Sequence, residues 1–353
     1  MNSSVPHMQN TEDAGVNPLF ATHPIAGEYR PPVIIVGLPR SGSSFLSHVL
    51  SQVQNWYVFD DLYLYRHAKG IGAAEGKLTQ EQLEKLIFML GWQVRARINF
   101  PKFHVPDIPL DDVDKMDEAL RQTYKDRDVT WHELQHEWLM RLAKHHNCEN
   151  WGYKAPQDFM NLDMLNEVYP DLKVVFLYRD PRKVMASFKN ITADNEDGHP
   201  GQYHPWVYSQ YWKMALSTLK QAKETLANEI LEIKFEDLVS EPQVTGDKIA
   251  KFLGAEVTGE IEVKKPNSSF SDKKRQGITP TETWICEKIA GSLMREKGYA
   301  DSDKPARFRI IDIPDLIYIC FRFTFYQIIR VIKDPDALVS IRTYMGSLFK
   351  KTH

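Results

Sequence analysis

A short apolar run followed by a glycine-rich loop constrains this chain more than any other feature of its sequence. Residues 33–36 are Val-Ile-Ile-Val, and a β-branched run of this length predicts a buried parallel strand. Residues 37–42 form a loop with two glycines five positions apart, and the apolar spacing of residues 43–54 predicts a helix directly after it. A strand, a loop and a helix in this order are typical of α/β proteins.

Strand and helix patterns alternate along much of the remaining chain. Apolar runs at residues 151–153, 173–178 and 230–235 predict three more strands, and helical patterns lie between them. Residues 56–150 differ, because they hold helical patterns and few strand patterns. The sequence therefore predicts an α/β fold, in which helices cover both faces of a parallel sheet and residues 56–150 form a large helical insertion.

Composition narrows the class of protein. The chain has 353 residues, with 44 Lys and Arg against 47 Asp and Glu, which argues against a polybasic nucleic-acid scaffold. Its 3 cysteines form no Cys-x-x-Cys pair, which favours a reducing compartment. Residues 1–30 lack the pattern of a signal peptide and are expected to form a flexible leader. We therefore expect a cytoplasmic protein with a single domain over residues 31–353.

The residues of the glycine loop indicate that it binds an anion. They are Gly37, Leu38, Pro39, Arg40, Ser41, Gly42, Ser43 and Ser44. Such a loop turns successive backbone N–H groups, together with the N-terminus of the next helix, toward a phosphate-like group. Ser43 stands where nucleotide triphosphatases carry the lysine of their phosphate loop, and Arg40 supplies a cation from inside the loop instead.

Two more cations directly follow predicted strands. Arg179 comes after residues 173–178, with Ser187 eight residues further on, and Lys154 comes after residues 151–153. Open α/β sheets bind ligands beyond the carboxyl ends of their strands. An arginine at such an end can hold a phosphate through two parallel hydrogen bonds. The three side chains and the loop together predict an anion-binding cleft.

These motifs, in this order, resemble those of the sulfotransferases. Residues 37–44 look like the loop that binds the 5′-phosphosulfate in that family, and residues 177–188 (LYRDPRKVMASF) look like its 3′-phosphate-binding segment. Residues 154–157 (KAPQ) and 231–239 (LEIKFEDLV) are similar to the branch that holds many bacterial enzymes and the tyrosylprotein sulfotransferases. The resemblance spans residues 32–254.

The resemblance implies a fold and a donor. The fold is a P-loop-kinase-like parallel sheet flanked by helices. The donor is 3′-phosphoadenosine 5′-phosphosulfate (PAPS), which leaves as adenosine 3′,5′-bisphosphate (PAP) and requires no metal. By this match the loop would hold the 5′ end of the donor, and Arg179 with Ser187 would hold its 3′-phosphate.

A later basic segment and one substitution belong to the same comparison. The segment resembles an Arg-Lys-Gly stretch that also contacts the 3′-phosphate in the cytosolic sulfotransferases, and its residues here are Lys273, Lys274, Arg275 and Gly277. Phe235 stands where the tyrosylprotein enzymes usually carry tyrosine, so no hydroxyl is available at that position.

Sulfuryl transfer needs a base for the acceptor proton and cations for the leaving oxygen. Arg40 and Lys154 suit the second role. For the base, Asp61 falls by count on the position of the catalytic glutamate of the tyrosylprotein enzymes, and its neighbour Asp60 is an alternative. His104 is a further candidate, because it lies in an aromatic, proline-bounded segment that could line an acceptor pocket.

Aromatic residues are concentrated in residues 56–110 and 199–212. In sulfotransferases the stretches between the shared motifs build the acceptor pocket, and aromatic walls suit a flat or partly apolar molecule. We therefore expect the helical insertion at 56–150 to form the acceptor pocket. The expected partner is a small-molecule metabolite with a hydroxyl or an amine, and not a nucleic acid.

Two other readings of the motifs compete with this one. The glycine loop also fits a P-loop nucleotide kinase or hydrolase that uses Mg²⁺, although the lysine of that motif is missing. His132, Glu133 and His136 match the His-Glu-x-x-His pattern of zinc metalloproteases, in which both histidines bind the metal from one helix face. The positions where the extended protease motif has its Gly and third His are leucines here, Leu139 and Leu142.

The most apolar stretch of the chain runs over residues 310–332. Charged residues and a proline interrupt it, so it predicts an amphipathic or buried helix and not a membrane span. It belongs to a C-terminal helical extension expected over residues 305–353. A cover for the sheet or the pocket, a subunit interface and a peripheral membrane contact are all open for this stretch.

Overall fold

The computed structural model describes residues 17–99, 107–194, 199–226, 229–261, 276–300 and 305–334, together with residues 338 and 346. The chain divides into two compact units. Unit 1 comprises residues 1–30 and 55–152, and unit 2 comprises residues 31–54 and 153–353. Each unit is described by itself.

The strands form one five-stranded sheet in the order β2-β3-β1-β4-β5. They are β1 (Val33–Gly37), β2 (Trp56–Phe59), β3 (Asn150–Lys154), β4 (Lys173–Tyr178) and β5 (Ile230–Lys234). In unit 2, β1 pairs with β4 and β4 with β5, both in parallel, and the register places Gly37 opposite Leu177. The four apolar residues of β1 are fully buried, as expected for a strand covered on both faces. The predicted α/β fold with a parallel sheet is confirmed.

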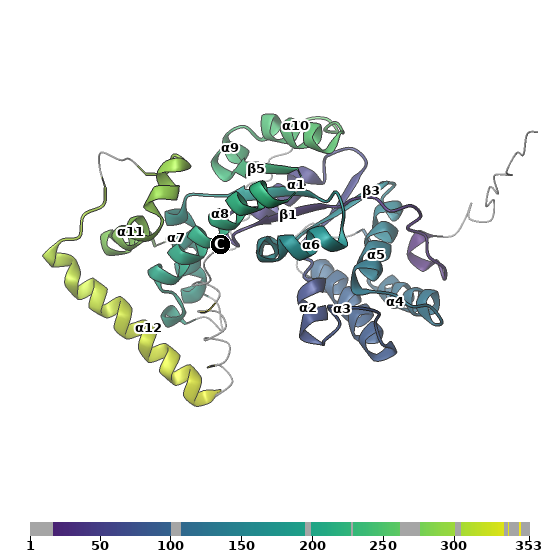
Figure 1. The fold of residues 1–353 in the computed structure, drawn as a ribbon, viewed down its shortest axis with the longest axis horizontal. Coiled ribbons are helices and arrows are strands. Elements are labelled where there is room, and N and C mark those ends of the chain that lie inside the picture. Colours follow the sequence, from purple (N-terminus) through teal and green to yellow (C-terminus); the bar gives the residue numbers. More distant parts are fainter. Residues whose placement is uncertain are drawn as a thin grey trace, which may run out of the picture. The chain divides into compact units, whose positions relative to one another are not determined.

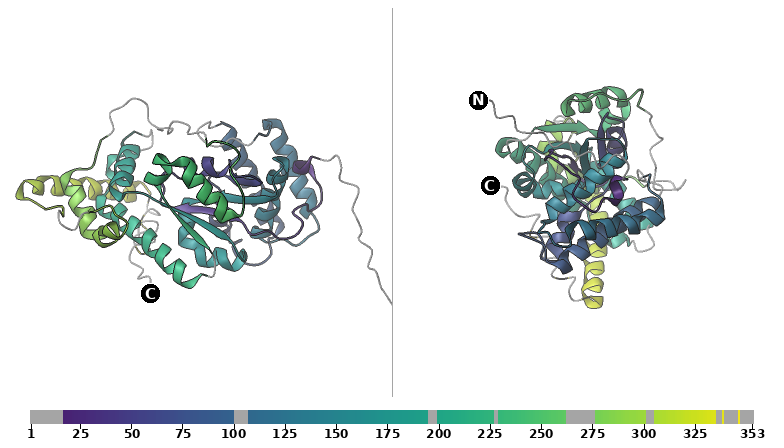
Figure 2. Two further views of the ribbon diagram at one scale, coloured as in Figure 1. Left: turned by 90° about the horizontal axis from the view of Figure 1, so that it is seen from above. Right: turned by 90° about the vertical axis from the view of Figure 1, so that its right-hand side faces the viewer.

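Helices surround the strands of unit 2. They are α1 (Ser43–Leu50), η2 (Pro156–Asn161), α6 (Leu162–Val168), α7 (Pro181–Asp194), η3 (Pro200–Gln202), α8 (Pro205–Thr225), α9 (Phe235–Ser240), α10 (Pro242–Leu253), α11 (Pro280–Glu296), η4 (Ile310–Asp312) and α12 (Ile313–Lys333). Figure 1 shows α10 and α6 on opposite sides of the strands, and Figure 2 gives two further views. α8 contacts both α7 and α11. Helix α7 therefore lies between the end of β4 and this helical layer.

The sequence patterns did not predict α11. Its start is nevertheless encoded locally, because Thr279 and Glu282 form a capping box in which each side chain bonds the backbone N–H of the other residue. Pro280 occupies the first helical turn, where a missing N–H group costs no hydrogen bond. None of the helices in the described ranges is long and apolar enough to cross a membrane.

Unit 1 is the mainly helical unit. Besides β2 it contains η1 (Pro18–Phe20), α2 (Leu64–Gly70), α3 (Gln80–Asn99), α4 (Leu110–Tyr124) and α5 (Trp131–His145). The helical patterns at 78–98, 113–124 and 129–146 correspond to α3, α4 and α5. Strand β2 was missed. All four of its residues, Trp-Tyr-Val-Phe, are buried, and so short a run shows no alternation from which a strand could be predicted.

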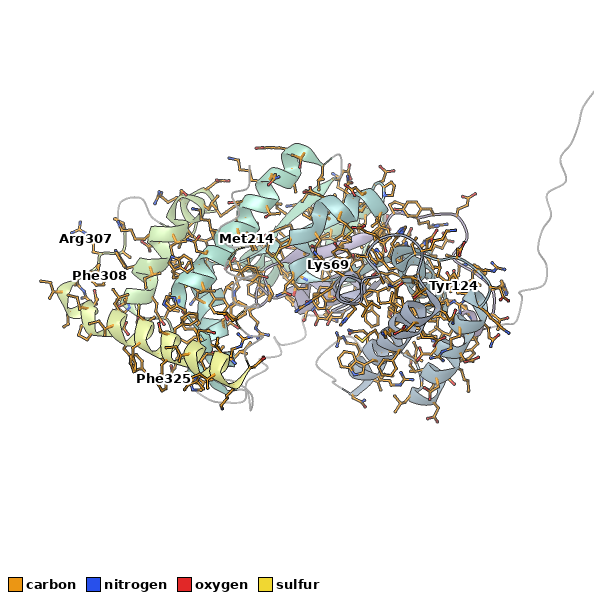
Figure 3. All side chains as sticks on the ribbon, turned by 60° about the horizontal axis from the view of Figure 1, so that its bottom comes forward. Lys69, Tyr124, Met214, Arg307, Phe308 and Phe325 are labelled. Atoms are coloured by element: carbon orange, nitrogen blue, oxygen red, sulfur yellow. The ribbon has the colours of Figure 1, made fainter. Side chains whose placement is uncertain are left out.

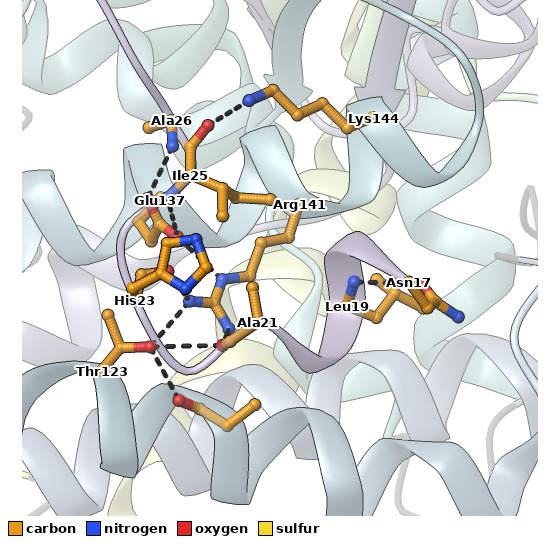
Figure 4. Close-up of polar contacts among 11 residues, drawn as sticks. Asn17, Leu19, Ala21, His23, Ile25, Ala26, Thr123, Glu137, Arg141 and Lys144 are labelled. Atoms are coloured by element: carbon orange, nitrogen blue, oxygen red, sulfur yellow. Dashed lines mark hydrogen bonds and ion pairs between the residues drawn. The ribbon is translucent and has the colours of Figure 1, made fainter. Parts of the chain in front are cut away.

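A buried ion pair ties the start of the chain to unit 1 (Figure 4). Arg141 Nε donates to Glu137 Oε1 over 2.8 Å, and both side chains are almost completely buried. Glu137 accepts hydrogen bonds from the backbone N–H groups of Ile25 and Ala26, and Arg141 donates to the carbonyl oxygen of Ala21. Residues 17–26 are therefore held in place and are not the flexible leader that the sequence predicted, because two buried charges need these partners. Residues 1–16 lie outside the described residues.

Candidate active site

The glycine loop lies between β1 and α1, as predicted. At Gly37 a Cβ atom would lie 2.1 Å from the carbonyl oxygen of Leu177 on the paired strand. At Gly42 a Cβ atom would lie 2.1 Å from Cε2 of Phe235, and the φ angle of 97° is one that side chains disfavour. Both glycines are required because the backbone of β4 approaches Gly37, and the Phe235 ring approaches Gly42, too closely for a side chain. The loop backbone consequently leads from β1 directly into the N-terminus of α1.

Arg40 adopts a left-handed backbone conformation with φ of 72°, which is uncommon for a residue other than glycine. Its half-buried side chain donates from Nε to Oγ of Ser187 over 3.2 Å. Ser187 belongs to α7, so this bond joins the loop to the helix that follows β4. The predicted 5′ and 3′ parts of the site are thereby in direct contact, and strained backbone of this kind is typical of functional sites.

Arg179 follows β4 directly and is held from three directions. Its Nη1 donates to the carbonyl oxygen of Arg40 over 3.5 Å, and its guanidinium carbon lies 4.2 Å from the centre of the Phe235 ring. Trp212 donates from its indole nitrogen to the carbonyl oxygen of Arg179 over 2.9 Å. A guanidinium stacked on an aromatic ring has its planar edge left for a ligand, which is the geometry suited to a phosphate.

Phe235 is the functional residue whose role sequence reasoning missed. The sequence identified it only as a position that lacks a hydroxyl group. In the structure its ring contacts both the Arg179 guanidinium and the backbone at Gly42. Its place directly after β5 was the available signal, because the carboxyl ends of neighbouring parallel strands meet at one edge.

The N-terminus of α7 is fixed by the charged residues Asp180 and Arg182. Asp180 accepts hydrogen bonds from the backbone N–H and the guanidinium of Arg182, and the backbone N–H of Asp180 donates to Glu236. The hydrogen bond to Asp180 holds the pKa of Arg182 above its usual value. These contacts lock the turn between β4 and α7, so they position Arg179 although they do not face the loop.

Lys154 is the last residue of β3 and is 1% exposed. Its Nζ donates to Oγ of Ser44 over 3.0 Å, which brings it to the end of the glycine loop. The sequence could not separate this arrangement from a solvated surface lysine. A buried ammonium group needs a polar or anionic partner, and the Ser44 hydroxyl of the loop is a polar partner for Lys154.

Of the late basic segment, only its end is described. The backbone N–H of Gln276 donates to Asn190 Oδ1, and Lys189 Nζ donates to the carbonyl oxygen of Gly277 over 3.4 Å. Both partners lie on α7, within one turn of Ser187. The segment therefore ends beside the helix that carries Ser187, while Lys273, Lys274 and Arg275 lie outside the described residues.

Two of the three candidate bases lie in unit 1. Asp60 and Asp61 follow β2, and Asp60 is 2% exposed. Arg97 of α3 donates to the carbonyl oxygens of Asp60 over 2.8 Å and Asp61 over 3.0 Å. Asp61 has a left-handed φ of 57°, and Tyr63 donates to its Oδ1 over 3.4 Å. The third candidate, His104, lies outside the described residues.

The His-Glu-x-x-His pattern has a structural explanation in α5. Glu133 is the third helical residue of a capping box and accepts hydrogen bonds from the backbone N–H and the hydroxyl of Thr130. The rings of His132 and His136 pack against Trp131 and Trp151 respectively. Burial lowers the pKa of both histidines. Over the described part of the chain, no group of three or more His, Cys, Asp or Glu residues could hold a metal ion.

Six aromatic residues from the stretches expected near an acceptor lie in the core instead. Trp56, Tyr57, Phe59, Tyr203, Tyr211 and Trp212 are all buried. Trp92 of α3 is an exception at 50% exposed, and Phe88, one turn earlier, is 60% exposed. Phe88 borders a cavity of about 380 Å³ in unit 1, which His67 and Ile71 also line.

The loop offers a polar group suited to an anionic ligand. The hydroxyl of Ser41 is 1% exposed and has no hydrogen-bond partner among the described residues. A buried hydroxyl without a partner is costly, and a phosphate or sulfate oxygen would accept its proton in a hydrogen bond. The residues of the loop therefore fit a 5′-phosphosulfate group.

Several solved structures are similar to this chain. Among solved structures, the sulfotransferase domain from the curacin biosynthetic pathway is similar over 75% of this chain and 98% of its own, with 17% identity and a TM-score of 0.48. A sulfotransferase from Mycobacterium avium covers 80% of this chain and 79% of its own, with 15% identity and a TM-score of 0.44. A sulfotransferase from Alicyclobacillus acidocaldarius covers 78% of this chain and 99% of its own, with 16% identity and a TM-score of 0.43. No curated protein matches the sequence.

The family model of the Sulfotransferase family matches residues 31–259, which is well over half of the chain. This range contains the glycine loop, Lys154, Arg179 and Ser187. It begins just before β1 and ends just after α10. The chain therefore belongs to the sulfotransferase family and is a sulfotransferase enzyme with an α/β fold.

Proposed function

We propose that this enzyme transfers the sulfuryl group of PAPS to a hydroxyl or an amine of a small-molecule metabolite. The observation that carries the proposal is the linkage of the two arginines. Arg40 donates to Ser187, and its carbonyl oxygen accepts from Arg179, so both ends of a bisphosphorylated donor would meet one connected set of groups. An ordinary strand–helix turn has no need for two linked arginines.

The roles of the individual residues follow from their chemistry. The loop of residues 37–44 would hold the 5′-phosphosulfate through its N–H groups and the Ser41 hydroxyl. Arg179, Ser187 and the segment that contains Lys273, Lys274, Arg275 and Gly277 would hold the 3′-phosphate. PAPS, when bound, supplies an activated sulfuryl group and a leaving phosphate. Arg40 and Lys154 would stabilise the charge that develops on the leaving oxygen, and this set requires no metal ion.

Transfer also requires removal of a proton from the acceptor. We assign this role to the Asp61 carboxylate, with Asp60 and His104 as alternatives. As the acceptor oxygen or nitrogen forms its bond to sulfur, the bond from sulfur to the leaving oxygen breaks and the acceptor proton passes to the carboxylate. Arg97 would hold this carboxylate in place through the two backbone carbonyl groups that it binds.

The acceptor is proposed to bind in the helical insertion of residues 56–150. Exposed Phe88 and the cavity beside it support an acceptor with an apolar part, because such cavities take up apolar ligand surface. The three free cysteines support a reducing location, which we propose to be the cytoplasm. A peripheral membrane contact of residues 310–332 is a separate proposal.

The experiment that tests this function measures transfer directly. Purified enzyme is incubated with radiosulfur-labelled PAPS and a small-molecule extract of cells, and labelled products are separated from the donor by chromatography. We expect new labelled small molecules that require the enzyme and persist in the presence of a metal chelator. If no label leaves the donor with any extract, the transfer proposal is contradicted.

The two competing functions are tested in the same preparation. A kinase or hydrolase would release or transfer the terminal phosphate of ATP only with Mg²⁺ present. A zinc protease would cleave a peptide substrate and lose that activity with the chelator. We expect neither activity, because Ser43 replaces the lysine of the kinase loop and Glu133 caps α5.

A further inference from the structure

Helix α12 exposes a continuous apolar face. Its members recur at intervals of three or four residues, which places them on one side of the helix. We call them the α12 stripe: Ile317, Tyr318, Phe321, Phe325, Ile328 and Ile332. Phe321 is 65% exposed and Ile332 is 75% exposed. Figure 3 shows Phe325 on the helix, and it shows Arg307 and Phe308 beside the N-terminal end. An exposed apolar surface formed by six neighbouring side chains indicates a binding surface.

The opposite face of α12 attaches the helix to unit 2 through polar contacts. Tyr326 stacks on His199 with ring centres 4.8 Å apart, and its hydroxyl accepts a hydrogen bond from Gln202 over 2.8 Å. Arg322 donates to the carbonyl oxygen of Tyr203. A surface helix normally buries its apolar side and exposes its polar side. The packed face of α12 does carry apolar groups, since Ile319 is 2% exposed and Phe323 packs on His204. The stripe is therefore a second apolar face, and the contacts of the first face hold it outward.

Charge distinguishes between the possible occupants of the stripe. Residues 305–334 carry five cations and three acids, a net charge of +2, whereas the whole chain carries −3. The cations are Arg307, Arg309, Arg322, Arg330 and Lys333, and the acids are Asp312, Asp315 and Asp334. Asp312 pairs with Arg309, and Asp315 accepts a hydrogen bond from Thr279. Exposed cations therefore lie at both ends of the stripe, with Arg307 at one end and Lys333 at the other, whereas Arg330, one turn after Tyr326, lies on the opposite face.

A second copy of the chain does not match this charge pattern. Two copies related by a two-fold axis could pair their stripes in parallel or antiparallel orientation. Either orientation brings one cationic end against another, and like charges at an interface oppose association. A flat anionic surface meets the cations at both ends at once and accepts the apolar stripe between them.

We infer that α12 binds the surface of a bilayer that contains anionic lipids. The helix would lie in the plane of the membrane, with the stripe among the upper parts of the acyl chains and with Arg307 and Lys333 at the headgroups. The inference does not depend on the donor or the acceptor, so its failure would leave the proposed function untouched.

The test is flotation of the full-length enzyme with lipid vesicles in a density gradient. Vesicles of phosphatidylcholine with about a third phosphatidylserine are compared with vesicles of phosphatidylcholine alone. We expect the enzyme to float with the anionic vesicles, and the bound fraction to fall as salt screens the headgroups. No flotation with anionic vesicles would overturn the inference.

Variants locate the contact on the helix. The triple variant Ile317→Ser, Phe321→Ser, Phe325→Ser is expected to lower vesicle affinity by at least about tenfold, because the apolar area drives insertion. The matched control is Phe88→Ser with Trp92→Ser on α3, which removes two exposed apolar side chains outside the stripe and should leave flotation unchanged. Equal loss in the control, or full binding by the triple variant, would contradict the proposal.

Two further measurements keep the outcome clear if the triple variant is unstable. Arg307→Glu with Lys333→Glu changes exposed charges and should abolish the preference for anionic vesicles. A polarity-sensitive dye on exposed Cys320, in a Cys148→Ser background, should shift its emission to shorter wavelength when vesicles are added. An unshifted dye would contradict insertion of the helix into the membrane. A dimer in sedimentation equilibrium that the triple variant dissociates, without any vesicle binding, would show instead that the stripe is a subunit interface.

Discussion

At the scale of single residues, Arg40 connects the parts of the site. Its side chain reaches Ser187 on α7, and its carbonyl oxygen accepts from Arg179 at the end of β4. Its left-handed backbone angle is a local cost that the loop tolerates. This combination indicates a side chain whose position serves a ligand, because a purely structural role would not need the strained angle.

Replacement of Arg40 by alanine should reduce turnover with little loss of stability. We expect kcat to fall by roughly 10²-fold, which is typical when a group that stabilises transition-state charge is removed. Arg40→Lys should keep part of the rate, because the charge remains but the bond from Nε is lost. Lys183→Ala, an exposed cation on α7, is the control, and an unchanged kcat in Arg40→Ala would contradict the assignment.

Asp61 should act as the proton acceptor, and its neighbour as a structural residue. Asp61→Asn is expected to lower kcat and to remove the acidic limb of the pH–rate profile, while donor binding stays within about twofold of the parent. Arg97→Gln should also lower kcat more than it changes KM, because the turn that carries Asp61 loses its clamp. If Asp60→Asn alone shows the lost acidic limb, Asp60 is the base.

At the scale of elements, the start of α9 and the glycine loop are packed against each other. Gly42→Ala would place a methyl group against the Phe235 ring, so we expect a lower melting temperature together with weaker PAP binding. Gly259→Ala is the matched control, since it also has a positive φ but no atom within 4 Å of the added carbon. Adding Phe235→Ala to Gly42→Ala should restore part of the lost stability. Equal melting temperatures for Gly42→Ala and Gly259→Ala would contradict the contact.

The packing of α3 against α4 should make stability depend on pH. Asp117 is 4% exposed on α4, and burial raises its pKa to about 6. A raised folded-state pKa favours the protonated form, so its contribution to stability is present below pH ~4 and is lost as the pH rises through about 6.

Asp117→Asn should remove this loss. Chemical denaturation from pH 4 to 8 should show the variant gaining on the parent by about 2 to 3 kcal/mol of unfolding free energy between pH 4 and 6.5, and no further above that. Asp114→Asn is the control, because its side chain is 86% exposed and shares the same partner, Arg95. A constant difference between Asp117→Asn and the parent across this range would contradict the account.

The sequence predicted the elements whose signals are local. The β-branched run of β1, the loop glycines and the spacing from Arg179 to Ser187 are all visible in a short window, and each is found where it was expected. The contact of Phe235 with Arg179 and Gly42, and the burial of Lys154, could not be predicted, because they depend on how strands far apart in the sequence are ordered. Strand β2 was missed because four apolar residues beside a helical region carry no period.

At the scale of the whole molecule, the described residues place the anion-binding groups and two candidate bases in different units. The loop, Lys154, Arg179 and Ser187 belong to unit 2, whereas Asp60 and Asp61 belong to unit 1. Under the proposed function, donor recognition would fall to unit 2 and proton removal to unit 1. Donor binding should therefore be measurable without any acceptor.

The most direct test of the central claim is calorimetric titration of the metal-stripped enzyme with PAP, with ATP–Mg²⁺ as the comparison. The account predicts binding of PAP with an affinity on the order of micromolar, loss of that binding in Arg179→Ala, and no comparable binding of ATP–Mg²⁺. No binding of PAP together with clear binding of ATP–Mg²⁺ would contradict the account and favour a nucleotide kinase.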